Sequence, residues 1–427
     1  MSFSFQDTSG FFRHGALLMA GTLLGSLFNA AFHVVAGRSL PGKEYAALVA
    51  MLGIILALGQ PMLAVQNTVA HYISRLVALG RSAEVFPFFA KAAPAWLLVL
   101  PPVFAALAAL AHPWLSMVWP VPVSLHCLVA ALIPLTLWMS LFSGLWQGLQ
   151  DFPRLAFIPQ LWGVVRFFLT VAAVFLGFRT ALWPLSAQLA GVLLVMAFGF
   201  AYLAARRPAD PAPLRPCPGA PPLAYLLKAV LALAAFGVLM NFDTSLALRF
   251  HPDRAGLFAK AATIARTAVF LPVPLAAALF PKVSSDGDAP PDTRRLLLRA
   301  LAAATVVLAC VLAACLLLPG LPWFILYGRC PEADLPAARA LVRAMSLAMT
   351  PLAFAYLLLN FEISQSRFLR PLLLLPLALL YVTLPPRIAP HLPADSAVLS
   401  IPLVLAAASI AAACILLPPG LFRKEKP

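Results

Sequence analysis

Five charged side chains lie inside long apolar runs, and their types suit them to bind an anion. A charge at the centre of a membrane helix costs about 2.5 kcal/mol or more, so such groups normally face a water-filled cavity or a partner. Arginine and lysine give charge-assisted hydrogen bonds to phosphate and carboxylate groups. The set is mainly basic and therefore predicts an anion-binding cavity, with these members: Arg166, Asp243, Lys260, Arg266 and Arg343.

Uncharged polar residues accompany these charges at helical spacing. Gly256, Lys260, Thr263 and Thr267 fall on one stripe of a helix expected over 254–281. Two pairs four residues apart, and one amide just before Asp243, extend the candidate site: Asn29 with His33, Asn67 with His71, and Asn241.

Several of these residues also have a purely structural interpretation. Asp243 can pair with Lys260 or Arg266 and so tie two helices together, which leaves less charge for the cavity. Arg343 can extend to the outer surface. The histidines can form interhelical hydrogen bonds rather than couple transport to protons. The sequence leaves these alternatives open.

The helices that carry these residues are expected to span a membrane. The chain has 427 residues, of which 62% are hydrophobic and 11% charged, whereas a soluble domain carries about 25% charged residues. Continuous apolar runs favour an all-α polytopic membrane protein. We expect about twelve spans: 14–36, 44–74, 90–111, 125–148, 154–177, 181–204, 223–248, 254–281, 296–319, 335–360, 368–386 and 395–418.

The chain is expected to contain two six-helix lobes, residues 1–205 and 223–427, joined by a Pro-rich cytoplasmic linker over 206–222. Lysine and arginine are concentrated in alternate loops, on the same side as both termini. The positive-inside rule then places both termini in the cytoplasm. The net charge of +15 is explained by this bias, and no nucleic-acid motif competes with it.

Two short turns indicate that the lobes are repeats. "RSLPGKEY" at 38–45 and "RFHPDRAG" at 249–256 share an outline. Parallel six-helix repeats are typical of some secondary transporters, which alternate access by moving one lobe against the other. At an offset of 211 positions, four pairs match: Arg38 with Arg249, Pro41 with Pro252, Lys43 with Arg254, and Pro61 with Pro272.

Residues 15–76 and 242–284 resemble the corresponding spans of Wzx-type oligosaccharide flippases, of the multidrug/oligosaccharidyl-lipid/polysaccharide (MOP) superfamily. The marks are a Gly-rich first span ending in "RSLPGKEY", and a span with Asp243 followed by the "HPDRAGLF" turn and a closing "LFP". The resemblance extends over roughly residues 10 to 290. It implies a MATE/MurJ-like V-shaped transporter fold with a cationic inner surface.

The resemblance also implies a function. Such a protein moves a polyprenyl-pyrophosphate-linked oligosaccharide across the inner membrane, and its partners would be membrane lipids, a polysaccharide polymerase and glycosyltransferases. We expect no enzyme activity, cofactor or metal, because the sequence shows no Walker loop, catalytic carboxylate pair or Cys/His cluster. The alternatives are a cation-coupled multidrug exporter, a membrane-embedded glycosyltransferase, and a non-transporting component of a polysaccharide synthesis complex.

Overall fold

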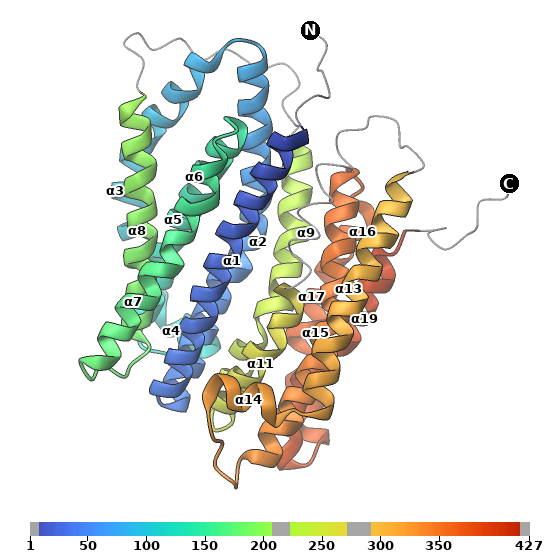
Figure 1. Ribbon diagram of the computed structural model, residues 1–427. Coiled ribbons are helices and arrows are strands. Elements are labelled where there is room, and N and C mark those ends of the chain that lie inside the picture. Colours follow the sequence, from blue (N-terminus) through green and yellow to red (C-terminus); the bar gives the residue numbers. More distant parts are fainter. Residues whose placement is uncertain (1–7, 207–222, 271–291, 419–427) are drawn as a thin grey trace, which may run out of the picture. The chain divides into compact units, whose positions relative to one another are not determined.

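The computed structural model describes residues 8–206, 223–270 and 292–418, and every regular element in these ranges is helical (Figure 1). Among these residues, ten helices are long and apolar enough to cross a membrane. The number is eleven if Val99–Leu110 and His112–Val118, which meet at 75°, form one bent span. The predicted all-α multi-pass membrane fold is confirmed. The predicted span 254–281 is described only as far as Phe270.

Contacts divide the chain into two compact units, here called unit 1 and unit 2. Unit 1 comprises residues 1–41 and 62–226, and unit 2 comprises 42–61 and 227–427. The predicted linker lies outside the described residues, apart from Arg206. The boundary places the first part of one helix, Gly42–Pro61, with the second half of the chain, whereas the sequence analysis assigned it to the first lobe.

Unit 1 is built around two tightly packed helix pairs, α3 with α5 and α7 with α8, with α1 lying against α6 and α7. Glycine allows close packing in this unit: a Cβ added at Gly144 of α5 would lie 2.7 Å from the carbonyl oxygen of Gln66 in α2. The helices of unit 1 are α1 (Thr8–Ser39), α2 (Gly42–Ala78, shared with unit 2), α3 (Val85–Leu110), α4 (His112–Val118), α5 (Val123–Gly148), α6 (Phe152–Phe157), α7 (Leu161–Phe175) and α8 (Leu182–Ala205).

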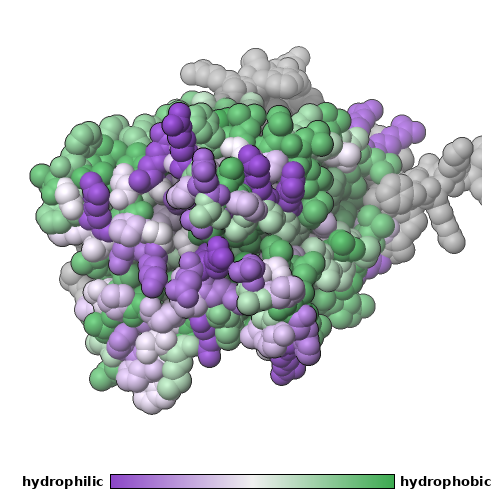
Figure 2. All heavy atoms as spheres, turned by 90° about the horizontal axis from the view of Figure 1, so that it is seen from below, coloured by the Kyte–Doolittle hydropathy of each residue, from purple (hydrophilic) through white to green (hydrophobic). Residues whose placement is uncertain are grey.

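Unit 2 is centred on α15, which packs against α11, α13 and α19. Its helices besides the start of α2 are α9 (Leu223–Asn241), α10 (Asp243–Phe250), α11 (Ala255–Phe270), α13 (Asp292–Leu317), α14 (Gly320–Tyr327), α15 (Leu335–Ser364), α16 (Leu369–Leu372), α17 (Leu374–Thr383), α18 (Pro385–Ile388) and α19 (Ser400–Leu416). Figure 2 looks onto the helix ends beside α14, where hydrophilic residues gather while hydrophobic residues cover the helix sides.

One helix end recurs in both units. Helix α5 is followed by Gln150 and α15 by Ser366, and both residues have a φ of 57° although neither is glycine. In each case the next amide reaches back across the turn, from Asp151 to the Trp146 carbonyl in unit 1 and from Arg367 to the Glu362 carbonyl in unit 2. This is the closing bond of a Schellman turn. The same bond also follows α2, from Arg81 to the Leu76 carbonyl, and α7, from Phe178 to the Ala173 carbonyl, so the turn does not distinguish a repeat.

Candidate functional site

The candidate residues of unit 2 gather where a membrane helix is interrupted. Helix α9 ends at Asn241 and α10 begins at Asp243, so the span predicted over 223–248 is broken at Phe242. A break within a membrane leaves backbone groups that need new partners. Arg266 of α11 supplies one, because its Nε donates a hydrogen bond to the Met240 carbonyl over 3.3 Å.

Arg266 also forms an ion pair with Asp243, the first residue of α10, and its Nη2 lies 3.3 Å from the Thr244 hydroxyl. Both charges are buried: Arg266 is 5% exposed and Asp243 is 0% exposed. Of the two partners that the sequence left open for Asp243, the structure shows Arg266. The arginine therefore joins both sides of the helix break to α11.

Asn241 is fully buried at the same break. Its amide nitrogen donates to the Gly237 carbonyl over 3.1 Å, and a Cβ added at Gly53 of α2 would lie 2.6 Å from the Asn241 carbonyl oxygen. These contacts place Asn241 in the packing between α9 and α2.

Lys260 is half-buried on α11 and lies beside two aromatic rings of α14. Its Nζ is 5.9 Å from the centre of the Trp323 ring and 5.4 Å from that of Tyr327. Within the described residues, no acidic side chain forms an ion pair with it. Its charge is stabilised by the ring faces but is not neutralised, so it stays available to an anion.

The other members of the predicted α11 stripe divide between packing and surface. A Cβ added at Gly256 would lie 2.8 Å from the Cα of Gly42, so α2 and α11 nearly touch at the two repeated turns. The Thr263 hydroxyl lies 3.3 Å from that of Tyr45, which lies 3.1 Å from that of Tyr327. Thr267 is exposed.

Sequence reasoning missed the two aromatic residues beside Lys260, Trp323 and Tyr327, and Tyr45, whose hydroxyl lies 3.1 Å from that of Tyr327. Tyr45 ends the quoted turn "RSLPGKEY", and Trp323 and Tyr327 lie four residues apart on α14. The spacing of the second pair could have indicated a shared helix face, but nothing in the sequence showed which face Lys260 contacts.

Arg166 of α7 is the candidate residue of unit 1 with the most unusual environment. Its side chain is 3% exposed, donates a hydrogen bond to the Asn29 amide oxygen of α1, and contacts two aromatic rings. Its Cζ is 3.8 Å from the centre of the Phe32 ring and 4.7 Å from that of Trp162. Its Nε is buried without a hydrogen-bond partner among the described residues.

Four further candidates lie closer to the surface. His33 is half-buried, with its ring centre 5.1 Å from that of Phe32. Asn67 and His71 are exposed on the part of α2 that belongs to unit 1. Arg343 is exposed on α15, and its Nε donates to the Leu316 carbonyl over 3.0 Å. Its surface position corresponds to the structural alternative for this residue.

Most of the buried charges among the described residues are paired. All three buried acidic side chains of the described part form ion pairs: Glu84 with Arg81, Asp243 with Arg266, and Glu362 with Arg370. Among the charged candidates, Arg166, Lys260 and the exposed Arg343 have no acidic partner in that part of the chain. Of these three, Arg166 in unit 1 and Lys260 in unit 2 are the ones that are buried or half-buried.

No family model matches the sequence, and no curated protein does. Solved structures do match. A MATE family multidrug resistance transporter of the MOP superfamily, in an inward-facing conformation, superposes with a TM-score of 0.69 at 13% identity over 94% of this chain and 96% of that one. A MATE protein in the straight conformation gives a TM-score of 0.64 at 15% identity, over 94% of each chain.

A third structure is a MOP superfamily transporter from Pyrococcus furiosus, for which reverse polarity of the binding pocket suggests a different function. It gives a TM-score of 0.61 at 15% identity, over 94% of this chain and 93% of that one. At these identities the likeness concerns the fold. The chain therefore has the fold of the MATE transporters of the MOP superfamily.

Proposed function

We propose that the protein is a MOP superfamily transporter that moves a polyprenyl-pyrophosphate-linked oligosaccharide across the cytoplasmic membrane by alternating access. The fold supports transport, because every structure compared above is described as a transporter or a MATE protein. The observation that carries the choice of substrate is the pair of uncompensated cations, Arg166 and Lys260.

Each of these two residues, taken in its own unit, suits a phosphate group. A guanidinium with an unused N–H and an ammonium held only by ring faces both gain charge-assisted hydrogen bonds when phosphate oxygens arrive. Within a membrane this gain is larger than in water, because the surroundings screen the charges less. The sugar would then be bound in unit 1 by groups that hydrogen-bond to hydroxyls, such as Asn29, His33, Asn67 and His71.

A multidrug exporter is the second candidate, since MATE family multidrug transporters share the fold. A cationic drug would need an acidic side chain free to bind it. All three buried carboxylates of the described part are already paired with arginines, which favours the anionic substrate. The Pyrococcus furiosus protein illustrates that pocket polarity differs within this fold.

The protein's setting follows from the same proposal. It would lie in the cytoplasmic membrane with both termini inside, act without catalysis of its own, and work beside glycosyltransferases and a polysaccharide polymerase. If the protein were instead a non-transporting member of such a complex, Arg166 and Lys260 would have no substrate to bind, and this alternative would not account for them.

Reconstitution into proteoliposomes tests the proposal. A fluorescent polyprenyl-pyrophosphate-linked oligosaccharide is placed in both leaflets, and the fraction quenched by an impermeant reductant reports its movement. Arg166→Gln and Lys260→Gln should each slow translocation by at least tenfold, because each removes a cation that holds the pyrophosphate. The matched control, Arg343→Gln, changes an exposed arginine and should stay within twofold of the wild type. Equal rates in all four proteins would refute the proposed role of the two cations.

A further inference from the structure

Two histidines of unit 1 contact each other across a pair of helices. His112 is the first residue of α4, and His126 lies in the first turn of α5. Their Nδ1 atoms are 3.0 Å apart, and their ring centres are 5.2 Å apart. His126 is 5% exposed, and its Nε2 is buried without a hydrogen-bond partner among the described residues. Neither histidine belongs to the anion site described above.

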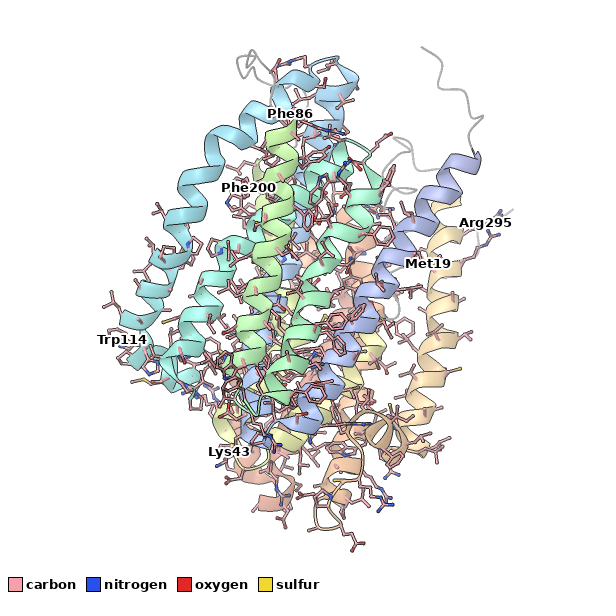
Figure 3. The ribbon with its side chains drawn as sticks, turned by 60° about the vertical axis from the view of Figure 1, so that its left-hand side comes forward. Met19, Lys43, Phe86, Trp114, Phe200 and Arg295 are labelled. Atoms are coloured by element: carbon pink, nitrogen blue, oxygen red, sulfur yellow. The ribbon has the colours of Figure 1, made fainter. Side chains whose placement is uncertain are left out.

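Helix α4 has few other contacts that fix its position. It follows α3 at an angle of 75°, and Figure 3 shows α3 running from the labelled Phe86 to the labelled Trp114. None of its residues is buried, and Trp114 and Met117 are 68% and 65% exposed. A helix that buries so little apolar surface gains little from packing. The hydrogen bond between the histidines is therefore a main part of its attachment to α5.

The number of protons on the two rings decides whether this bond can form. A neutral imidazole has one N–H donor and one acceptor nitrogen, whereas a protonated imidazole has two donors. A bond between two Nδ1 atoms needs a hydrogen on one and a lone pair on the other. When both rings are protonated, both Nδ1 atoms carry hydrogen, so the bond is lost and two positive charges face each other. The observed contact is therefore incompatible with a doubly protonated pair.

The surrounding elements offer no negative charge to stabilise two protonated rings. Helices α3, α4, α5 and α8 contain no aspartate or glutamate. Lys91 of α3 lies 19 residues before the end of that helix, roughly 28 Å along it from the pair. Arg154 of α6 and its partner Asp151 follow the far end of α5. Arg179, in the turn before α8, is exposed and basic, so it does not offset a second proton.

Two imidazole nitrogens this close could also hold a metal ion, but the surroundings favour a shared proton. Zinc sites in proteins normally have at least three protein ligands. Within the described ranges, no group of three His, Cys, Asp or Glu residues is placed to hold a metal. A metal-bound histidine also donates its other N–H to a further group, whereas the Nε2 of His126 has no such partner in the described part of the chain.

We propose that the His112–His126 pair is a pH-dependent attachment that holds α4 on α5 and releases it when both rings are protonated. The attached pair binds fewer protons than the separated rings, so attachment is favoured at higher pH and lost on acidification. With both termini in the cytoplasm, as proposed above, α4 follows the third span and lies at the outer face. The pair then responds to the pH outside the cytoplasm, whatever substrate is transported.

Hydrogen–deuterium exchange of the protein in nanodiscs tests the attachment. The pH is lowered from about 7.5 to about 5, on either side of the usual histidine pKa of about 6.5. Exchange of the α4 amides, corrected for the intrinsic effect of pH, should rise at least fivefold, while the central amides of α5 stay within twofold. His112→Phe keeps a ring but cannot titrate, so it should remove this pH response. The control His391→Phe, an exposed histidine of unit 2, should keep it.

The wild-type measurement needs no variant to fold and can overturn the proposal by itself. Equal protection of the α4 amides at both pH values would show that the pair does not release the helix. A pH response that survives in His112→Phe would assign it to other groups. Zinc ions added at the higher pH should leave exchange of α4 unchanged. If zinc instead protects α4, the two histidines form a metal site and the proposal is wrong.

Discussion

Arg166 and Arg266 are both buried arginines, yet their surroundings assign them different tasks. Arg266 forms an ion pair with Asp243 and donates a hydrogen bond to the Met240 carbonyl, so its positive charge is compensated within unit 2. Arg166 has one amide oxygen and two rings, and its Nε is unpartnered. The first arrangement stabilises a helix break, whereas the second leaves a cation that, under the proposed function, binds the substrate.

This difference predicts a contrast in stability. Arg266→Gln leaves the Asp243 carboxylate buried without its cation and should lower the free energy of unfolding by about 3–5 kcal/mol. Adding Asp243→Asn removes the orphaned charge and should recover part of that loss. Thermal unfolding of the purified proteins in detergent measures both effects. A double variant no more stable than Arg266→Gln would show that the ion pair does not hold the break.

Some features of the candidate site could be predicted from the sequence and others could not. The charges at membrane depth could be found because each interrupts an apolar run. The Asp243–Arg266 pair was one of two open alternatives. Trp162 lies four residues before Arg166 on the same helix, a spacing that sequence reasoning could have used, whereas Phe32 and Trp323 lie on helices distant in the chain from the cations they contact. Only the packing of these helices brings them to the cations.

At the scale of elements, α2 and α11 hold the informative contact. The two turns that the sequence analysis matched, around Gly42 and Gly256, lie against each other in unit 2. The Lys43 ammonium, labelled in Figure 3, lies 3.9 Å from the Asp253 carboxylate across the same contact. The offset of 211 indicated a repeat but gave no sign that the two copies touch.

A pair of glycine substitutions tests this contact. Gly256→Ala places a methyl group 2.8 Å from Gly42 and should destabilise the protein by about 1–3 kcal/mol. Gly59→Ala, in the same α2 helix, meets nothing within 4 Å and should stabilise it by roughly 0.5–1 kcal/mol through helix propensity. Unfolding in detergent distinguishes the two. If both substitutions stabilise the protein, the helices do not approach as described.

At the scale of the whole molecule, composition was enough to predict an all-α multi-pass membrane protein, because apolar runs of this length have no other stable form in lipid. Helix breaks were harder to predict. The interruption at Phe242 carries no proline or glycine, and it depends on Arg266 from another helix. The division of α2 between two units was not predicted either, because a continuous helical pattern carries no sign of which unit each part packs against.

The fold is compatible with both an oligosaccharide-lipid flippase and a drug exporter. The proposal chooses the flippase because Arg166 and Lys260 are positively charged and have no acidic partner among the described residues, which suits an anionic substrate rather than a cationic drug. The most direct test compares two substrates in proteoliposomes of the wild-type protein: a fluorescent polyprenyl-pyrophosphate-linked oligosaccharide, and a cationic dye with an imposed proton or sodium gradient. We predict translocation of the lipid-linked oligosaccharide at least tenfold above protein-free vesicles and no gradient-driven movement of the dye. Movement of the dye without movement of the oligosaccharide would contradict the account.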